Sequence, residues 1–157
     1  MSSTARITLS ALVAAIAAVV GITASVATAR PSCTPGVRTV GGSTVRTFCG
    51  PATATAKVGG KTFRFTGGQC AVEQGYFTVN IGAITLGSEK PKYAYLGIDV
   101  KPPKPGTHTS QILSWQEPGK RYSLLPAKVT LAAGLHSGTF SGPVLGGGGS
   151  GTGSFHC

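Results

Sequence analysis

The sequence predicts an all-β protein, a single antiparallel β-sandwich of about seven to nine strands held by two disulfides. After residue 30, no stretch keeps apolar residues at helical spacing, whereas several stretches alternate apolar and polar residues. The chain also contains 24 glycines and 10 prolines, which favour turns between short strands. The disulfides are predicted from four cysteines, all of which lie after residue 30.

The first 29 residues predict a secretory signal peptide. Arg6 precedes an apolar run from Leu9 to Ile22, and the small residues Ala27-Thr28-Ala29 suit signal peptidase. The run is shorter than the roughly 20 residues of a membrane-spanning helix, so cleavage after Ala29 is favoured over an uncleaved anchor. We expect a secreted domain of residues 30–157 without a transmembrane segment, either released or associated with the cell envelope.

Two hairpins can be aligned from the sequence. In "TATAKVGGKTFRF" (53–65), a turn at Gly59-Gly60 places Ala56 opposite Phe63 and Lys57 opposite Thr62. One face of this hairpin is then apolar and the other polar, which supports the register. The second hairpin turns at Pro118-Gly119 and places Trp115 near Tyr122, an aromatic pair that is best explained as core.

Further strands are predicted by alternation at 76–86, 93–100, 128–132 and 137–145. The segment "KPPKPG" (101–106) is predicted to be an extended loop, because proline has no amide hydrogen for a sheet.

A glycine run near the last residue has the letters of a dinucleotide-binding loop, with Gly146, Gly148 and Gly151 spaced as G-x-G-x-x-G. Such a loop needs a following helix whose amides face the phosphate, and only six residues follow Gly151. We therefore predict a hairpin turn. The returning strand "GTGSFHC" would place Phe155 and Cys157 on the same side.

The four cysteines Cys33, Cys49, Cys70 and Cys157 allow three pairings, and the sequence alone does not decide among them. We favour a short bridge between Cys33 and Cys49 and a long one between Cys70 and Cys157, which would join an early strand to the last.

The segments "GGKTFRFTGGQC", "FTVNIG" and "SGTFSG" and the final "SFHC" together resemble the lipoprotein antigens of mycobacteria and related actinobacteria. The resemblance covers roughly residues 57–157. It implies a framework disulfide between Cys70 and Cys157, association with the cell envelope and no catalytic residue. This chain departs from the family pattern, because it has no lipidation cysteine and because "CTPGVRTVGGSTVRTFC" is an added element.

The charge of the chain favours acidic partners. Its net charge is +10, and removal of the signal with Arg6 leaves 13 basic and four acidic residues, or +9. Such a surface suits an anionic cell-wall polymer, a lipid headgroup or nucleic acid, although high charge also serves solubility alone. Nothing indicates sequence-specific recognition of nucleic acid.

No grouping of catalytic or metal-binding residues is evident. The four acids are far apart in sequence and are predicted to be surface residues, and the three histidines lack metal-ligand spacing: Glu73, Glu89, Asp99, Glu117, His108, His136 and His156. No G-x-S-x-G motif is present. We therefore predict a protein that is not an enzyme and has no cofactor or metal.

Two surfaces are candidates for ligand binding. Tyr93 and Tyr95 share one strand face and could stack on sugars while nearby lysines neutralise an anion, which gives the candidate set Tyr93, Tyr95, Lys92, Lys101 and Lys104. The second surface is the polar face of the first hairpin, with Lys57 and Arg64 and, in one arrangement, Arg46. Each has a purely structural alternative: the tyrosines could be core, and the basic face could be merely solvated.

The sequence thus predicts a non-catalytic secreted or cell-envelope module that binds an anionic or glycan ligand. The alternative is a protein-binding domain, such as a secreted protease inhibitor that presents "KPPKPG" or the segment between Cys33 and Cys49. Loops restrained by proline or a disulfide lose little entropy on docking.

Overall fold

The computed structural model describes residues 33–157 except residues 89 and 111. All of these belong to one unit, Ser32–Cys157. The predicted signal peptide and Glu89 lie outside the described residues. Strands predominate, and the only described helix is the short 3-10 turn η1 (Ala133–Leu135), so no described helix has the length and apolar character needed to cross a membrane.

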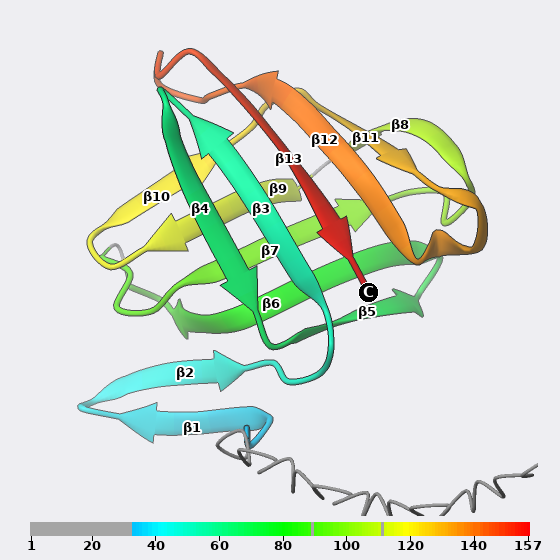
Figure 1. Cartoon of the computed structure of the whole chain (residues 1–157). Helices are drawn as coiled ribbons and strands as arrows, with labels where there is room; N and C mark the ends of the chain where they lie inside the picture. The colour runs from blue at the N-terminus through cyan, green and yellow to red at the C-terminus, as the bar shows by residue number, and fades with distance from the viewer. Residues whose placement is uncertain (1–32, 89, 111) are drawn as a thin grey trace, which may run out of the picture. The chain divides into compact units, whose positions relative to one another are not determined.

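The strands form two antiparallel sheets, which confirms the predicted β-sandwich (Figure 1). The six-stranded sheet has the order β4 (Lys61–Thr66), β3 (Thr53–Val58), β13 (Ser150–His156), β12 (Ser137–Pro143), β11 (Ala127–Leu131) and β8 (Gly106–Ser110). The seven-stranded sheet has the order β1 (Gly36–Val40), β2 (Ser43–Thr47), β6 (Tyr76–Leu86), β7 (Tyr95–Val100), β9 (Ile112–Glu117) and β10 (Lys120–Ser123), and β5 (Gly68–Glu73) also pairs with β6.

The hydrophobic core lies between the sheets and follows the alternation of the strands. Phe77, Val79 and Ile81 of β6 are buried, as their spacing predicted, and alternate residues of β3 and β11 face them from the other sheet. Trp115 is fully buried and stacks on Tyr122 with ring centroids 5.3 Å apart, so this predicted pair belongs to the core. Burial of aromatic and aliphatic side chains is the main source of stability in such a sandwich.

Both predicted hairpin registers are confirmed. Ala56 pairs with Phe63 and Lys57 with Thr62 across the Gly59-Gly60 turn, and Tyr122 pairs with Trp115 in the second hairpin. The glycine run is the turn between β12 and β13, as expected. Gly146, Gly147 and Gly149 all have φ near +90°, a backbone conformation that glycine adopts without strain.

The β12–β13 hairpin packs through two reciprocal glycine–phenylalanine pairs. Gly138 lies opposite Phe155, and Phe140 lies opposite Gly153. A methyl group added to either glycine would meet the ring of its partner phenylalanine and the carbonyl oxygen of the neighbouring strand. Each phenylalanine ring thus fills the space that its partner glycine leaves open, and both rings are buried in the core.

Both disulfides have the favoured pairing. Cys33–Cys49 closes the β1–β2 hairpin over a sequence separation of 16 residues. Cys70–Cys157 spans 87 residues and ties β5 of one sheet to the residue that follows β13 of the other. The long bridge therefore holds the two layers together at the end of the last strand.

The described part of the chain forms thirteen strands, more than the seven to nine expected. The additional ones include β1 and β2, which form a hairpin where a disulfide-bonded loop was predicted, and β5 and β8, which were not anticipated. The strand predicted at 93–100 begins at Tyr95, and Ala94 before it is exposed. Residues 101–105 of the predicted loop "KPPKPG" connect β7 to β8, and Gly106 is the first residue of β8.

Candidate functional site

The outer face of the six-stranded sheet carries a regular array of hydroxyl and basic side chains. The inward residues of these strands are apolar or glycine in most positions, so alternation places the polar residues on the opposite side. Because the sheet registers align these residues across the strands, they form three rows. We call the whole array the hydroxyl face.

The rows follow from the pairings of adjacent strands. Row A consists of Thr109, Lys128, Ser141, Thr152, Lys57 and Thr62, in the order β8, β11, β12, β13, β3, β4. Row B consists, in the same order, of Thr107, Thr130, Thr139, Ser154, Thr55 and Arg64. Row C crosses the last four of these strands and consists of Ser137, His156, Thr53 and Thr66.

Hydrogen bonds link neighbouring hydroxyls within row B. Thr107 Oγ1 and Thr130 Oγ1 lie 2.8 Å apart, and Thr55 Oγ1 and Ser154 Oγ lie 3.1 Å apart. A hydroxyl can donate one hydrogen bond and accept two, so each pair keeps capacity for a ligand. The pairs also fix side-chain rotamers, which lowers the entropy that a ligand would have to remove.

The hydroxyl face is basic. It carries Lys57, Arg64, Lys128 and His156, and none of the six strands contains a carboxylate side chain. The three described acids lie on the other sheet, in β5, β7 and β9: Glu73, Asp99 and Glu117. The lysine and arginine charges on this face therefore have no carboxylate neighbour within their own sheet.

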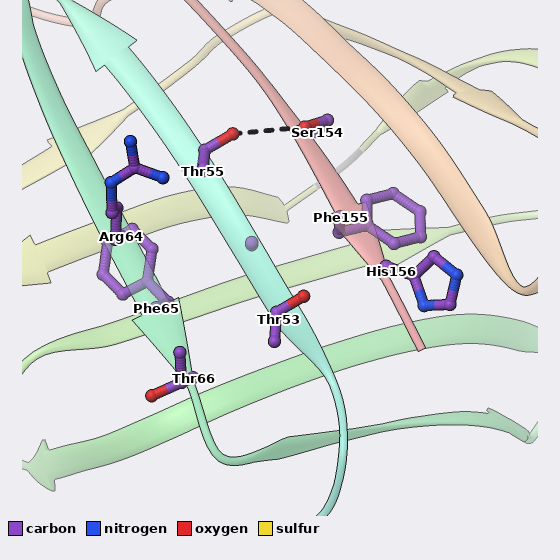
Figure 2. A pocket seen from close by; sticks show the side chains of 9 residues that line it. Thr53, Thr55, Arg64, Phe65, Thr66, Ser154, Phe155 and His156 are labelled. Atoms are coloured by element: carbon purple, nitrogen blue, oxygen red, sulfur yellow. Dashed lines mark hydrogen bonds between the residues drawn. The ribbon is translucent and has the colours of Figure 1, made fainter. Parts of the chain in front are cut away.

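Part of the hydroxyl face is hollowed (Figure 2). The hollow spans β4, β3 and β13, and Figure 2 shows Arg64 beside the hydrogen-bonded pair Thr55 and Ser154, with His156 further along β13. Polar side chains from rows B and C form its rim: Thr53, Thr55, Arg64, Thr66, Ser154 and His156. A shallow hollow with a polar rim suits an extended ligand better than an enclosed small molecule.

Sequence analysis identified two members of this array, Lys57 and Arg64, from the register of one hairpin. Arg46, suggested as a third, lies instead on β2 of the other sheet, with its guanidinium 4.9 Å from the centre of the Phe48 ring. The remaining members were missed because they come from strands that pair across long sequence separations. The signal that could have indicated them is the alternation of polar residues with small or apolar ones in "AKVTL" (127–131) and "SGTFSG" (137–142).

The first predicted site is only partly assembled. Tyr95 is on the outer face of the seven-stranded sheet, but its ring lies along its own strand over Gly97, and its hydroxyl donates a hydrogen bond to Asn80 Oδ1 at 2.6 Å. Burial raises the pKa of Tyr95 to about 12, with a further contribution from the Asp99 carboxylate and an opposing one from Arg46. This tyrosine is packed against protein on one side and is engaged at its polar end.

The lysines of that predicted site lie at different places. Lys92 precedes β7 and donates a hydrogen bond to Ser43 Oγ at 3.2 Å, whereas Lys101 and Lys104 follow the other end of β7. Lys101 Nζ lies 5.1 Å from the centre of the Tyr76 ring. Tyr93, which is partly exposed, accepts a hydrogen bond from Gln116 at its backbone oxygen. The structure thus brings Lys92 near the start of β7 but not next to the loop lysines.

Two acids that are separated in sequence line one hollow on the seven-stranded sheet. Glu73 and Asp99 share it with Tyr76, Thr78 and Ile112. Burial raises the pKa of the Asp99 carboxyl above its ordinary value. Sequence spacing alone could not reveal this proximity, which depends on the pairing of β5 and β7 with β6.

The described histidines do not gather. His108 is on β8, where its Nε2 lies 2.7 Å from the Lys104 backbone oxygen, His136 follows η1 and His156 is on β13. Within residues 33–88, 90–110 and 112–157, no three histidine, cysteine or acidic side chains are grouped as metal ligands would be.

Comparisons with protein-family models, with curated proteins and with solved structures found no match to this chain. The resemblance to actinobacterial lipoprotein antigens therefore stays a prediction from the sequence.

Proposed function

We propose that this protein is a non-catalytic module, secreted or held at the cell envelope, that binds a polyanionic glycan or wall polymer on the hydroxyl face. One observation carries the proposal. Twelve serine and threonine side chains and four basic ones form three aligned rows on a sheet without a carboxylate side chain.

The chemistry of the rows suits a polymer that repeats anionic groups and hydroxyls. Arg64 offers a planar fork of donors for a phosphate or carboxylate, and Lys57 and Lys128 supply point charges at other positions of the face. Threonine and serine hydroxyls can both donate to and accept from sugar hydroxyls. Each contact is exposed to water and therefore weak, so useful affinity needs many contacts along one polymer chain.

An extracellular location agrees with two features. Both disulfides are formed in the described chain, and disulfides persist mainly in oxidising compartments. The predicted signal peptide would deliver the domain there. Of the two segments named for the protein-binding alternative, the one between Cys33 and Cys49 is a paired hairpin, β1 and β2, and "KPPKPG" lies in the connection from β7 to β8. The alternative stays a prediction.

The test compares two triple variants of the oxidised domain that remove the same charge. The face variant is Lys57→Gln/Arg64→Gln/Lys128→Gln, and the matched control is Lys92→Gln/Lys101→Gln/Lys104→Gln, which removes the lysines of the other candidate site. Binding to immobilised polygalacturonate, poly(glycerol phosphate), neutral dextran and duplex DNA is measured at about 50 mM and about 300 mM salt, because salt screens exposed charges over about 10 Å at 0.1 M.

We expect binding to an anionic polymer that weakens with salt, is lost in the face variant and persists in the control. Loss in the control variant alone would assign binding to the region of Tyr93 and Tyr95 instead. Equal loss in both variants, or equal binding to DNA of any sequence, would mean that net charge rather than the hydroxyl face controls binding. Absence of binding to every polymer would overturn the proposed function.

A further inference from the structure

A second basic hollow lies where two turns of the six-stranded sheet meet a strand of the other sheet. The β3–β4 turn and the β12–β13 turn lie side by side (Figure 1), and residues 120–122 of β10 complete the lining. The space between them has a volume of about 330 Å³, in the size range of small-ligand sites. Its walls are Lys61 of β4, Lys120, Arg121 and Tyr122 of β10, and Gly146 and Gly148 of the glycine run.

The walls of this end hollow are positively charged. Lys61, Lys120 and Arg121 are all exposed, and no carboxylate is among the lining residues. The nearest acid in the pairing is Glu117, which lies opposite Lys120 and accepts a hydrogen bond from the Tyr122 hydroxyl at 3.2 Å. Lys61 and Lys120 therefore bring two cations to the hollow, and one carboxylate is engaged beside it. Arg121 alternates with Tyr122, so its guanidinium lies on the other side of β10, where Gln116 is.

Lys120 is held at the hollow, because its Nζ lies 4.9 Å from the centre of the Tyr122 ring in a cation–π contact. A donor positioned in this way loses less entropy on binding an anion. Arg121 is held away from the hollow: it donates from Nε and Nη2 to Gln116 Oε1 at 3.4 and 3.2 Å, on the other side of β10.

The glycine run gives the hollow an open backbone wall. The turn is closed by Val144 N donating to Gly149 O at 2.8 Å and by Gly147 N donating to Val144 O at 3.3 Å. Gly146 and Gly148 have no side chain to keep a ligand away from this backbone. Val144 and the exposed Leu145 add apolar surface to the hollow, whereas Tyr122 and Val58 are buried behind it.

The end hollow continues from the hydroxyl face. Lys61 pairs with Val58, and the next pair along β3 and β4 is Lys57 with Thr62, the end of row A. One residue of a strand advances about 3.3 Å and turns its side chain to the opposite face of the sheet. A polymer along row A therefore reaches Lys61 by bending around the edge strand β4 at the β3–β4 turn.

From this continuity, charge and shape we infer that the end hollow is a second subsite, which binds one anionic sugar unit of the polymer that lies on the hydroxyl face. This inference rests on the proposed function for its ligand. The recognised chemistry is an anion carried on a sugar ring, either a uronate or a sugar phosphate. Engagement of both subsites by one chain raises affinity beyond either subsite alone.

The test uses the oxidised domain with galacturonate, galactose 6-phosphate, and oligogalacturonates of increasing length. The hollow variant is Lys61→Gln/Lys120→Gln, and its charge-matched control is Lys101→Gln/Lys104→Gln. Calorimetry gives affinities, and amide NMR shifts of Gly146 and Gly148 report occupation of the hollow. The comparison of the two monosaccharides distinguishes a uronate from a phosphate ligand.

We expect monosaccharide-induced shifts at Gly146 and Gly148 that disappear in the hollow variant and remain in the control. Affinity for long oligomers should fall about tenfold in the hollow variant and less for oligomers too short to span both subsites. The subsite would be overturned if the hollow variant bound oligogalacturonates of every length as tightly as the unmodified protein while the face variant lost binding. The hydroxyl face would then remain the binding surface. Loss in the hollow variant with unchanged binding in the face variant would instead overturn the proposed function of the hydroxyl face.

Discussion

Thr55 Oγ1 and Ser154 Oγ lie 3.1 Å apart on the outer face of the six-stranded sheet, although 99 residues separate them in sequence. The pairing of β3 with β13 brings them together, and the same pairing places Thr53 beside His156 and Lys57 beside Thr152. One long-range strand contact thus joins three pairs of polar residues on a single surface. The order of the rows on the hydroxyl face depends on this contact.

Removing hydroxyls from this pair should weaken binding without unfolding the protein. We expect Thr55→Val/Ser154→Ala to lower affinity for an anionic polymer two- to tenfold, because a hydrogen bond contributes about 0.5–1.5 kcal/mol. Stability should change by no more than about 0.5 kcal/mol, since both residues are at the surface. Thr44→Val on β2 is the control, and an equal loss of affinity in this variant would argue against a role for the hydroxyl pair.

The reciprocal glycine–phenylalanine pairs predict a different result for a small change in the core. Gly153→Ala should destabilise the domain by about 1–3 kcal/mol, because its methyl group would overlap the Phe140 ring and the Thr55 carbonyl oxygen. Urea unfolding measures the change, with Thr152→Ala on the exposed side of the same strand as the control. An unchanged free energy of unfolding would mean that the strands around Gly153 can move apart to accept the methyl group without loss of stability.

The alternation of residues along the sequence was sufficient to predict the two hairpin registers. It was not sufficient to predict every strand or the order of the strands in the sheets. Alternation with a two-residue glycine turn fixed which residues of β3 and β4 face each other, because a one-residue slip would expose Phe63 and Phe65. The segments of β8, "GTHTS", and β5, "GQCAVE", carry no clear alternation and become strands only by pairing with β11 and β6. Pairing with a neighbouring strand stabilises the extended conformation, for which these segments have little preference of their own.

The candidate sites, too, could be predicted from the sequence only where they depend on local register. Hairpin register alone placed Lys57 and Arg64 on one polar face, whereas their neighbours in rows A and B come from strands up to 99 residues away. The outward position of Tyr95 could be predicted from alternation. Its hydrogen bond to Asn80 and its position over Gly97 could not, because both depend on how β6 and β7 pair and on side-chain packing.

The two disulfides should contribute unequally to stability. In the loop-entropy description, a bridge across 87 residues contributes about 4.5 kcal/mol and one across 16 residues about 3 kcal/mol. Cys70→Ser/Cys157→Ser should therefore lower the urea midpoint more than Cys33→Ser/Cys49→Ser, and it also removes the tie between the sheets. A larger loss in the second variant would show that the β1–β2 hairpin supports the sandwich more than the last strand does.

Asp99 should make stability fall with rising pH. Burial raises the folded-state pKa of its carboxyl above the ordinary value of 3.8, so the folded protein holds this proton more tightly than the unfolded chain. The stability associated with the protonated form is complete below pH 3.8 and is lost as pH rises through the folded-state pKa. Asp99→Asn removes this loss, so the variant should gain stability relative to the unmodified protein across that window.

Urea unfolding at a series of pH values checks this prediction, with Glu73→Gln as the control from the same hollow. The difference between Asp99→Asn and the unmodified protein should grow with pH and then remain constant. Parallel stability curves over the whole range would mean that the Asp99 carboxyl is fully hydrated in the folded protein.

The titration of Tyr95 decides whether its ring is packed or available to a ligand. Its pKa is raised from 10.0 to about 12, chiefly by burial, so stability due to the neutral phenol is present below pH 10 and is lost between pH 10 and about 12. Absorbance titration should show a phenol ionising near pH 12 that is missing in Tyr95→Phe. Asp99→Asn should lower this pKa and Arg46→Gln should raise it, since these are the charges that shift it. Ionisation of Tyr95 near pH 10 would mean that the ring is open to solvent, and it would restore Tyr93 and Tyr95 as a stacking surface in competition with the hydroxyl face.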